Sequence, residues 1–331
     1  MRNFFIVIAF LATTSLSFGR WTNVGSPKFT SDRVNFTSIK ALSPTNIFVA
    51  HTTDLALSSK ISVQRYNGES WSFVGNPGFS PGTAAEPSLE ILNNFPVVVF
   101  IDGANNTKAS VMRFDGTTWV YMGTPGFSTG SVSFPKIAVS NGIAYVAFQE
   151  QIGANRKASV MRFNGTIWEY VGMAGFSTGN VFEIDFKVQG TTPYISFREF
   201  ISTENNKISV MSFNGTSWNY VGAAGISENI IGGARGNNSL TFAPTTNIPH
   251  IAISERSATS TNQRRVSVRS FNGSTWTLVG TPIPDVADVG TQSVRLLFYD
   301  NKPTLAYANN APDVLFRGSV VAYNGNAWIN V

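Results

Sequence analysis

Seven tryptophans occur in the chain, and each opens the same short phrase, as in WSFVG, WVYMG and WEYVG. They are Trp21, Trp71, Trp119, Trp168, Trp218, Trp276 and Trp328, separated by 50, 48, 49, 50, 58 and 52 residues. One supersecondary unit is therefore repeated along the whole chain. A repeat of this length without an internal helical pattern is typical of a β-propeller, in which each repeat forms one four-stranded blade.

The second repeat shows the four strands that such a blade needs. We expect them at residues 88–92, 96–102, 108–114 and 119–123, and the second of these, PVVVFID, is apolar on both faces. A strand that lies between two neighbouring blades has this composition. Asn-Gly or Asp-Gly follows the third strand of all six repeats, which predicts tight type I′ hairpins. The sequence thus predicts an all-β fold, a six-bladed β-propeller of four-stranded antiparallel blades.

The segment 21–25 is an extra copy of the fourth strand, with no first three strands before it. The sixth repeat already carries its own fourth strand at Trp328. The extra copy is expected to compete with that strand, to add outside it, or to stay loose. Pairing between molecules through this spare strand is a further alternative, which would make the protein an oligomer.

The N-terminus has the pattern of a secretory signal peptide. Residues 1–19 contain one Arg, an apolar run at 4–12, and small residues at the cleavage position. We expect residues 20–331 to form one domain, secreted and extracellular, or periplasmic in a bacterium. The apolar run is too short for a transmembrane segment. The chain has no cysteine, so disulfides play no part.

The net charge gives little support for a nucleic-acid partner. The formal charge of +5 falls to +4 when Arg2 is removed with the signal peptide, and charged residues make up only 13% of the chain. Nucleic-acid-binding surfaces normally gather Lys and Arg on one face, and the longest basic run here is Arg264-Arg265.

Two columns of polar residues recur at the loops that join the second strand of each blade to the third. The first column lies at the end of the second strand and contains His51, Asp102, Glu150, Glu199, Glu255 and Asn309. The second begins the third strand and contains Lys60, Lys108, Lys157, Lys207, Arg265 and Arg317. The carboxylates are candidates for binding sugar hydroxyls or cations. Cross-strand ion pairs are the favoured alternative, because catalysis needs one asymmetric constellation and not several equivalent pairs.

A third column lies in the loop that leaves each blade, in phrases such as GNPGFSPG and GTPGFSTG. Phe79, Phe127, Phe176 and Ile226 share one position, and each precedes a serine. An apolar side chain there is expected to wedge between blades. The alternative is that the aromatic rings line clefts between blades and contact a sugar or a short peptide.

The first strands of the blades, which line the central channel, differ in charge from repeat to repeat. Glu183 and Asp185 are two residues apart and are expected to face the same side of a strand, with Arg295 on another blade. This trio is an alternative site for acid–base chemistry at the channel mouth. No catalytic signature, cofactor motif or metal-ligand spacing is recognised, so we predict no catalytic residue, no cofactor and no metal.

The repeat KASVMRFNGTIWEYVGMAGFSTG resembles the unit of a large group of secreted propeller proteins. The plan of six blades of about fifty residues is also similar to fungal fucose-binding and tectonin lectins, whose sugar sites lie between or on blades. The turn FDGTTW at 114–119 differs from the Asp-box of sialidases by one missing residue. The resemblance implies a fold and no particular activity, and we predict a non-enzymatic binding or adhesion module for carbohydrate or an extracellular protein. A glycan-processing hydrolase or lyase is the alternative.

Overall fold

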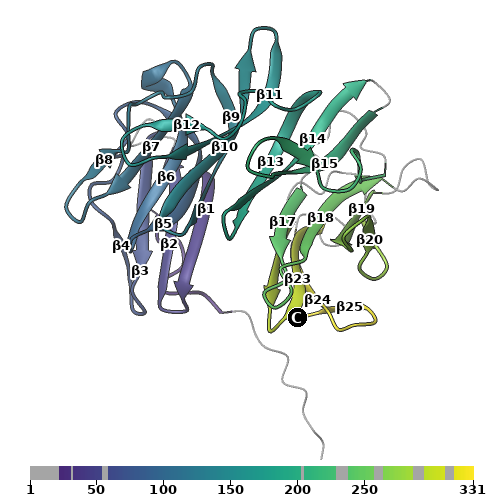
Figure 1. The fold of residues 1–331 in the computed structure, drawn as a ribbon. Helices are drawn as coiled ribbons and strands as arrows, with labels where there is room; N and C mark the ends of the chain where they lie inside the picture. The colour runs from purple at the N-terminus through teal and green to yellow at the C-terminus, as the bar shows by residue number, and fades with distance from the viewer. Residues whose placement is uncertain are drawn as a thin grey trace, which may run out of the picture.

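The computed structural model describes residues 22–30, 33–53, 59–202, 205–228, 238–256, 264–285, 294–309 and 317–331. These residues form six blades of four antiparallel strands arranged in a ring (Figure 1), which confirms the predicted fold class. The predicted signal peptide, 1–19, lies outside the described residues. Among the described residues, no helix is long and apolar enough to span a bilayer.

The strands of each blade follow one another in the sequence from the channel outward. Blade 1 contains β1 (Val34–Ser43), β2 (Asn46–Thr53), β3 (Ile61–Tyr66) and β4 (Trp71–Phe73). Blade 2 contains β5 (Ala84–Leu92), β6 (Phe95–Asp102), β7 (Lys108–Phe114) and β8 (Trp119–Tyr121), with a 3-10 turn at Gly103–Asn105. Blade 3 contains β9 (Val132–Ser140), β10 (Ile143–Ile152), β11 (Asn155–Phe163) and β12 (Trp168–Tyr170).

The second half of the chain repeats this order. Blade 4 contains β13 (Asn180–Gln189), β14 (Thr192–Ser202), β15 (Asn205–Phe213) and β16 (Trp218–Tyr220). Blade 5 contains β17 (Asn238–Phe242), β18 (Pro249–Arg256), β19 (Arg264–Phe271) and β20 (Trp276–Leu278), and β21 (Ile283–Asp285) pairs with β19. Blade 6 contains β22 (Val294–Tyr299), β23 (Lys302–Asn309), β24 (Arg317–Tyr323) and β25 (Trp328–Asn330).

The core lies between consecutive blades. Val97, Val98, Val99 and Phe100 of β6 are all fully buried, because β6 has a neighbouring blade on each face. The odd-numbered members pack toward blade 3 and the even-numbered ones toward blade 1. Burying such a side chain contributes about 1.5–3 kcal/mol. The continuous apolar run predicted for this strand therefore serves two interfaces at once.

The hairpins between the third and fourth strands differ from the predicted type I′ turns. Phe163 pairs with Trp168 and leaves a four-residue loop, in which Asn164 Oδ1 accepts hydrogen bonds from the backbone N–H groups of Thr166 and Ile167 at 3.0 and 2.9 Å. Only the glycine has a positive φ, +107° at Gly165. The type I′ prediction was wrong because the Asn side chain replaces a backbone acceptor, so its own backbone need not turn left-handed.

The extra N-terminal copy packs against blade 1. Trp71 Nε1 donates to the carbonyl of Val24 at 2.8 Å, and Phe29 stacks on Trp71 with centroids 4.3 Å apart and planes 11° apart. Between blades 1 and 2 the same contacts recur, since Trp119 Nε1 donates to Val74. Meanwhile β25 completes blade 6, and the Val331 N–H donates to Val320 at 3.1 Å. Residues 22–30 thus supply blade 1 with the loop that a preceding blade would provide.

Phe29→Ala is expected to lower stability by about 1–2 kcal/mol, because a half-buried ring loses its stacking surface. Lys28→Gly is the matched control. Lys28 has φ +56° where Gly78 has +62°, so glycine there should be neutral or stabilising by up to about 1 kcal/mol. Thermal unfolding followed by calorimetry checks both variants. An unchanged melting temperature for Phe29→Ala would mean that the N-terminal segment does not hold blade 1.

Candidate functional site

The loop that leaves each blade is held by two serines. Ser128 Oγ accepts from the backbone N–H of Ala109 at 3.0 Å, and Ser110 Oγ accepts from the backbone N–H of Gly126 at 2.8 Å. The same pair of bonds recurs in blades 1, 3 and 4. These contacts attach the Gly-Phe-Ser loop to the third strand of its own blade. The recurring serine of the loop is therefore used for folding.

A buried carboxylate lies behind each of these loops in blades 2 to 4. Glu150 is fully buried and accepts from Ser159 Oγ at 2.6 Å, from Tyr170 Oη at 2.8 Å and from the backbone N–H of Thr129 at 2.8 Å. Asp102 and Glu199 make the equivalent Ser and Tyr contacts in blades 2 and 4. Their acceptor capacity is largely taken up by the protein itself. Ligand binding by Asp102, Glu150 and Glu199 stays a prediction that would require these bonds to exchange.

The tyrosines in this network remain protonated donors at neutral pH. Burial, together with the adjacent Glu150 carboxylate, raises the pKa of Tyr170 to about 12, and burial with Glu199 does the same for Tyr220. Each hydroxyl therefore keeps the proton that it donates to the carboxylate.

Among the described residues, the cross-strand ion pair predicted for this column forms in blade 5. The register is as expected, with Asp102 opposite Lys108, Glu150 opposite Lys157 and Glu199 opposite Lys207. Within the described part of the chain, however, none of these three lysines forms an ion pair with its carboxylate. Lys157 Nζ instead donates to the carbonyls of Ser177 and Thr178, at 3.2 and 2.6 Å. The carboxylates point into the blade because buried serine hydroxyls donate hydrogen bonds to them there.

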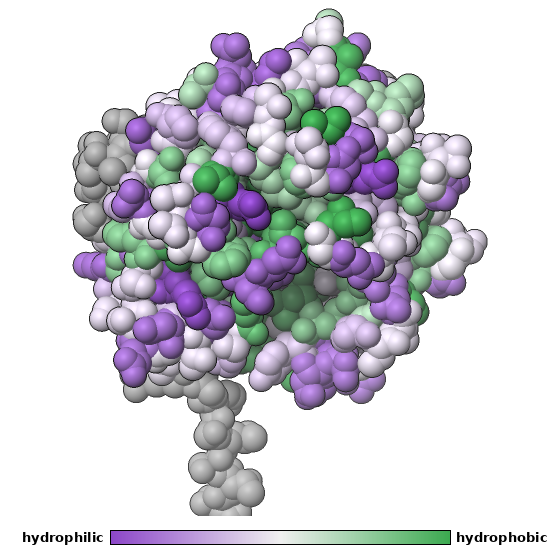
Figure 2. All heavy atoms as spheres, turned by 60° about the vertical axis from the view of Figure 1, so that its left-hand side comes forward, coloured by the Kyte–Doolittle hydropathy of each residue, from purple (hydrophilic) through white to green (hydrophobic). Residues whose placement is uncertain are grey.

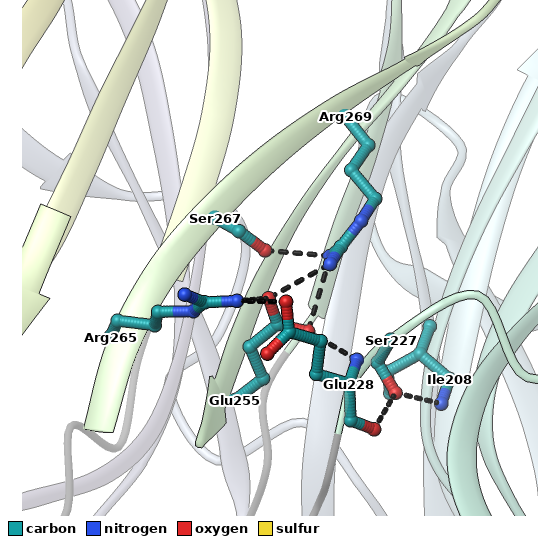
Figure 3. Close-up of polar contacts among 7 residues, drawn as sticks. All are labelled: Ile208, Ser227, Glu228, Glu255, Arg265, Ser267 and Arg269. Carbon is teal, nitrogen blue, oxygen red and sulfur yellow. Dashed lines mark hydrogen bonds and ion pairs between the residues drawn. The ribbon is translucent and has the colours of Figure 1, made fainter. Parts of the chain in front are cut away.

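Blade 5 satisfies the same carboxylate with different donors (Figure 3). Leu278 stands where blades 2 to 4 have the tyrosine, and Arg269 donates to both oxygens of Glu255, at 2.9 and 3.2 Å. Arg265 lies 3.6 Å from the same carboxylate and also pairs with Glu228. In blade 1, His51 replaces the carboxylate and contacts Gln64 at 3.1 Å, and burial lowers the pKa of His51. In blades 1 to 5 the protein's own groups thus supply partners at this position, so a structural role accounts for these contacts.

The loop phenylalanines stack on the tryptophan of the next blade. Phe79 lies over Trp119 at 3.9 Å, Phe127 over Trp168 at 4.8 Å, and Phe176 over Trp218 at 4.3 Å, with interplanar angles of 4°, 18° and 7°. All three rings are half-buried. One face of each ring is therefore occupied, as the wedge interpretation expects. A ligand contact through Phe79, Phe127 or Phe176 stays a prediction.

The three residues of the alternative channel site are engaged separately. A β-bulge between Phe182 and Asp185 puts Glu183 at φ +58°, so the expected common orientation of Glu183 and Asp185 does not follow. Glu183 forms an ion pair with Arg198 at 3.0 Å. Asp185 accepts from the backbone N–H of Leu240 on blade 5 at 2.8 Å. Arg295 is exposed and donates to its own neighbour's carbonyl.

Lys136 belongs to the same channel layer as Asp185 and Arg295. Desolvation by the surrounding strands lowers the pKa of Lys136, and the nearby Asp185 carboxylate opposes that shift. Among the described residues, no three His, Asp or Glu side chains are grouped as metal ligands. The channel thus carries residues of both charges, and an acid–base role for Glu183, Asp185 and Arg295 stays a prediction.

An open groove lies between blades 2 and 3, on the face opposite the Gly-Phe-Ser loops. It has a volume of about 730 Å³ and is bounded by the turns that join the first strand to the second and the third to the fourth. Its walls carry Arg113 and Asn93 from blade 2, and Ile143, Arg162, Phe163 and Thr166 from blade 3. Figure 2 shows one face of the molecule, on which hydrophilic and apolar residues are interspersed and which is hollowed in its lower half. Grooves of this composition suit small polar ligands.

The groove between blades 3 and 4 is equivalent, with a volume of about 470 Å³. Arg162 takes the place of Arg113 in it, and Thr192 takes the place of Ile143, as the strand registers show. Between blades 1 and 2 the corresponding residue is Phe95, whose ring lies 6.3 Å from that of Phe114 and beside Gly116. A large ring thus occupies the position that is left open in the other two grooves.

The sequence analysis missed the residues of these grooves. In blades 1 to 3, Arg65, Arg113 and Arg162 lie three residues before the Gly of the Asn-Gly or Asp-Gly turn, and this regular spacing is a signal that the sequence contains. The strand pattern alone predicts only that these side chains face outward, and not that they line a groove.

The chain was also compared with known proteins. No protein-family model matches it, and no curated protein is significantly similar in sequence. Its fold is similar to that of the six-bladed, fucose-recognising lectin of Aleuria aurantia, with 15% identity over 89% of this chain and 93% of the lectin and a TM-score of 0.57. A triple arginine-to-alanine variant of AofleA from Arthrobotrys oligospora gives 14% identity, coverage of 90% and 85%, and a TM-score of 0.55.

A polysaccharide lyase, an ulvan lyase, is also similar in fold. It is 8% identical, with 86% of this chain and 77% of the lyase covered and a TM-score of 0.55. At such identities the likeness establishes the propeller fold. The neighbours therefore include both a lectin and a lyase, and the chain is a six-bladed β-propeller similar in fold to carbohydrate-recognising proteins.

Proposed function

We propose that this protein is an exported carbohydrate-binding propeller that holds glycans in the grooves between blades 2 and 3 and between blades 3 and 4. The observation that carries the proposal is the repetition of one open groove, with a guanidinium and an aromatic ring at equivalent positions and hydroxyl groups in each groove. Sugar recognition needs directional hydrogen bonds beside a flat apolar surface, and these grooves contain both.

Two equivalent shallow sites suit binding to a polymer or a decorated surface. Each site alone is expected to bind weakly, because an open groove excludes little water. A ligand that reaches both grooves gains an effective concentration in the millimolar range for the second contact, which strengthens overall binding by about 10²–10⁴. The signal-peptide pattern of residues 1–19 supports export, where polymeric glycans are met.

A residue difference between blades suggests the substitution that tests the proposal. Ile143→Phe introduces at blade 3 the residue that blade 2 carries at Phe95, and is expected to fill one groove. Calorimetric titration with an oligosaccharide identified on a glycan array should then show one site fewer. Adding Thr192→Phe should remove the second site and abolish binding.

Ile329→Phe is the matched control, since Ile329 is similarly exposed but lies on β25 of blade 6, away from both grooves. Binding unchanged in the Ile143→Phe/Thr192→Phe variant would exclude the grooves. Cleavage of a polysaccharide by the wild-type protein, lost on Asp185→Asn, would instead support the hydrolase or lyase alternative with Glu183, Asp185 and Arg295.

A further inference from the structure

The three equivalent arginines differ in how strongly the protein engages them. Arg65 Nε donates to Asn46 Oδ1 at 2.8 Å, and its guanidinium lies 5.5 Å from the centre of the Phe48 ring. Arg162 lies 3.9 Å from the Glu169 carboxylate. Arg113 has no hydrogen-bond or ion-pair partner among the described residues, and it is exposed. The protein's own contacts with these guanidinium groups thus become fewer from Arg65 to Arg162 to Arg113. Arg113, which has the fewest, lines the larger of the two grooves.

The groove between blades 2 and 3 brings two of these arginines together. Arg113 lines it from blade 2 and Arg162 from blade 3, and no Asp or Glu is among the described residues that line it. Glu169 is the nearby acid, pairing with Arg162 and accepting a hydrogen bond from Asn164 Nδ2 at 2.6 Å. The groove therefore carries two positive charges, of which Glu169 partly offsets one.

We propose, on the basis of the function proposed above, that the groove between blades 2 and 3 selects acidic glycans, and that Arg113 and Arg162 bind a carboxylate or sulfate group of the sugar. A guanidinium presents a planar pair of N–H donors that matches the oxygens of such groups. Asn93 and Thr166 lie on opposite walls of the same groove and supply amide and hydroxyl groups for the neighbouring sugar hydroxyls. The ring of Phe163 adds an apolar surface for the sugar face.

A solvated surface arginine is the simpler alternative, and two observations weigh against it. Both arginines belong to one concave groove and come from different blades, so their meeting depends on the ring and not on local sequence. In addition, the equivalent position between blades 1 and 2 combines the large Phe95 ring with an arginine that the protein itself binds. The free guanidinium and the open groove occur together.

The experiment compares uronic-acid or sulfated oligosaccharides with their neutral counterparts. The wild-type protein is expected to bind the acidic members about tenfold more tightly or better at low salt, and to lose most of that preference at about 0.5 M salt, where charges are screened. Arg113→Gln should weaken acidic binding about tenfold and neutral binding much less, whereas Arg113→Lys should keep part of the acidic binding. Arg65→Gln is the matched control and should change neither.

A second variant acts in the opposite direction. Glu169→Gln removes the carboxylate that competes for Arg162, and is expected to strengthen acidic binding several-fold. A merely structural role for these residues would not predict a gain. Equal binding of acidic and neutral glycans, both lost in the Ile143→Phe/Thr192→Phe variant, would overturn the acidic preference and leave the carbohydrate function standing. Absence of binding to either class by the folded protein would overturn both.

Discussion

Trp168→Ala is expected to destabilise the propeller by about 3–5 kcal/mol, the loss typical of deleting a buried aromatic side chain. Trp168 is 6% exposed, stacks on Phe127 of the preceding blade, and contacts Phe163 of its own at 5.3 Å. Its Nε1 donates to the carbonyl of Met122 at 2.7 Å across the blade interface. The substitution removes these contacts together and leaves a cavity between blades 2 and 3.

Urea unfolding followed by circular dichroism measures this loss. Trp168→Phe keeps most of the apolar surface but has no N–H donor, so a smaller loss of about 1–2 kcal/mol is expected for it. A loss below about 1 kcal/mol for Trp168→Ala would show that this tryptophan does not hold the two blades together. Because the groove between blades 2 and 3 lies at the same interface, Trp168→Ala is also expected to weaken glycan binding.

Glu150→Ala is expected to cost about 3–5 kcal/mol, since it leaves several buried donors without an acceptor. The carboxylate accepts from the hydroxyls of Ser159 and Tyr170 and from the backbone N–H groups of Thr129 and Gly130. Ser159 is fully buried, so its hydroxyl cannot turn to water instead. The loop that leaves blade 2 is then expected to lose its attachment to blade 3.

Glu169→Ala provides the contrast on the same blade. Glu169 pairs with Arg162 at 3.9 Å at the surface, and an exposed ion pair contributes about 0–1 kcal/mol. The same urea titration separates the two variants. If Glu150→Ala were as stable as Glu169→Ala, the carboxylates of blades 2 to 4 would be available for ligands, and the binding role predicted for Asp102, Glu150 and Glu199 would regain support.

The N-terminal segment shows what a repeat pattern can predict and what it cannot. The sequence predicts an extra copy of the fourth strand but leaves four alternatives for where it lies. The structure adds that Phe29 and Val24 contact Trp71 as a preceding blade would. Local sequence could not decide this, because the contact joins residues that are 47 positions apart in the chain.

The six-bladed, four-stranded architecture was determined by the sequence alone. Its signals are local: an apolar run for each buried strand, a turn residue pair at a fixed register, and a Trp at a constant interval. The partners of the polar columns were decided only by the tertiary structure. Asp102 is flanked in register by Lys108, yet it binds Ser110 and Tyr121, 8 and 19 residues away.

The same division applies to the candidate site. The arginine column is visible in the sequence. That Arg113 and Arg162 line one groove, however, depends on how two blades pack. How open each groove is depends on whether Phe, Ile or Thr stands at the neighbouring turn. Strand periodicity says which side chains leave a blade's surface. Which of these side chains lie close together depends on the angle and spacing between neighbouring blades. Side-chain packing across the whole interface sets that angle and spacing.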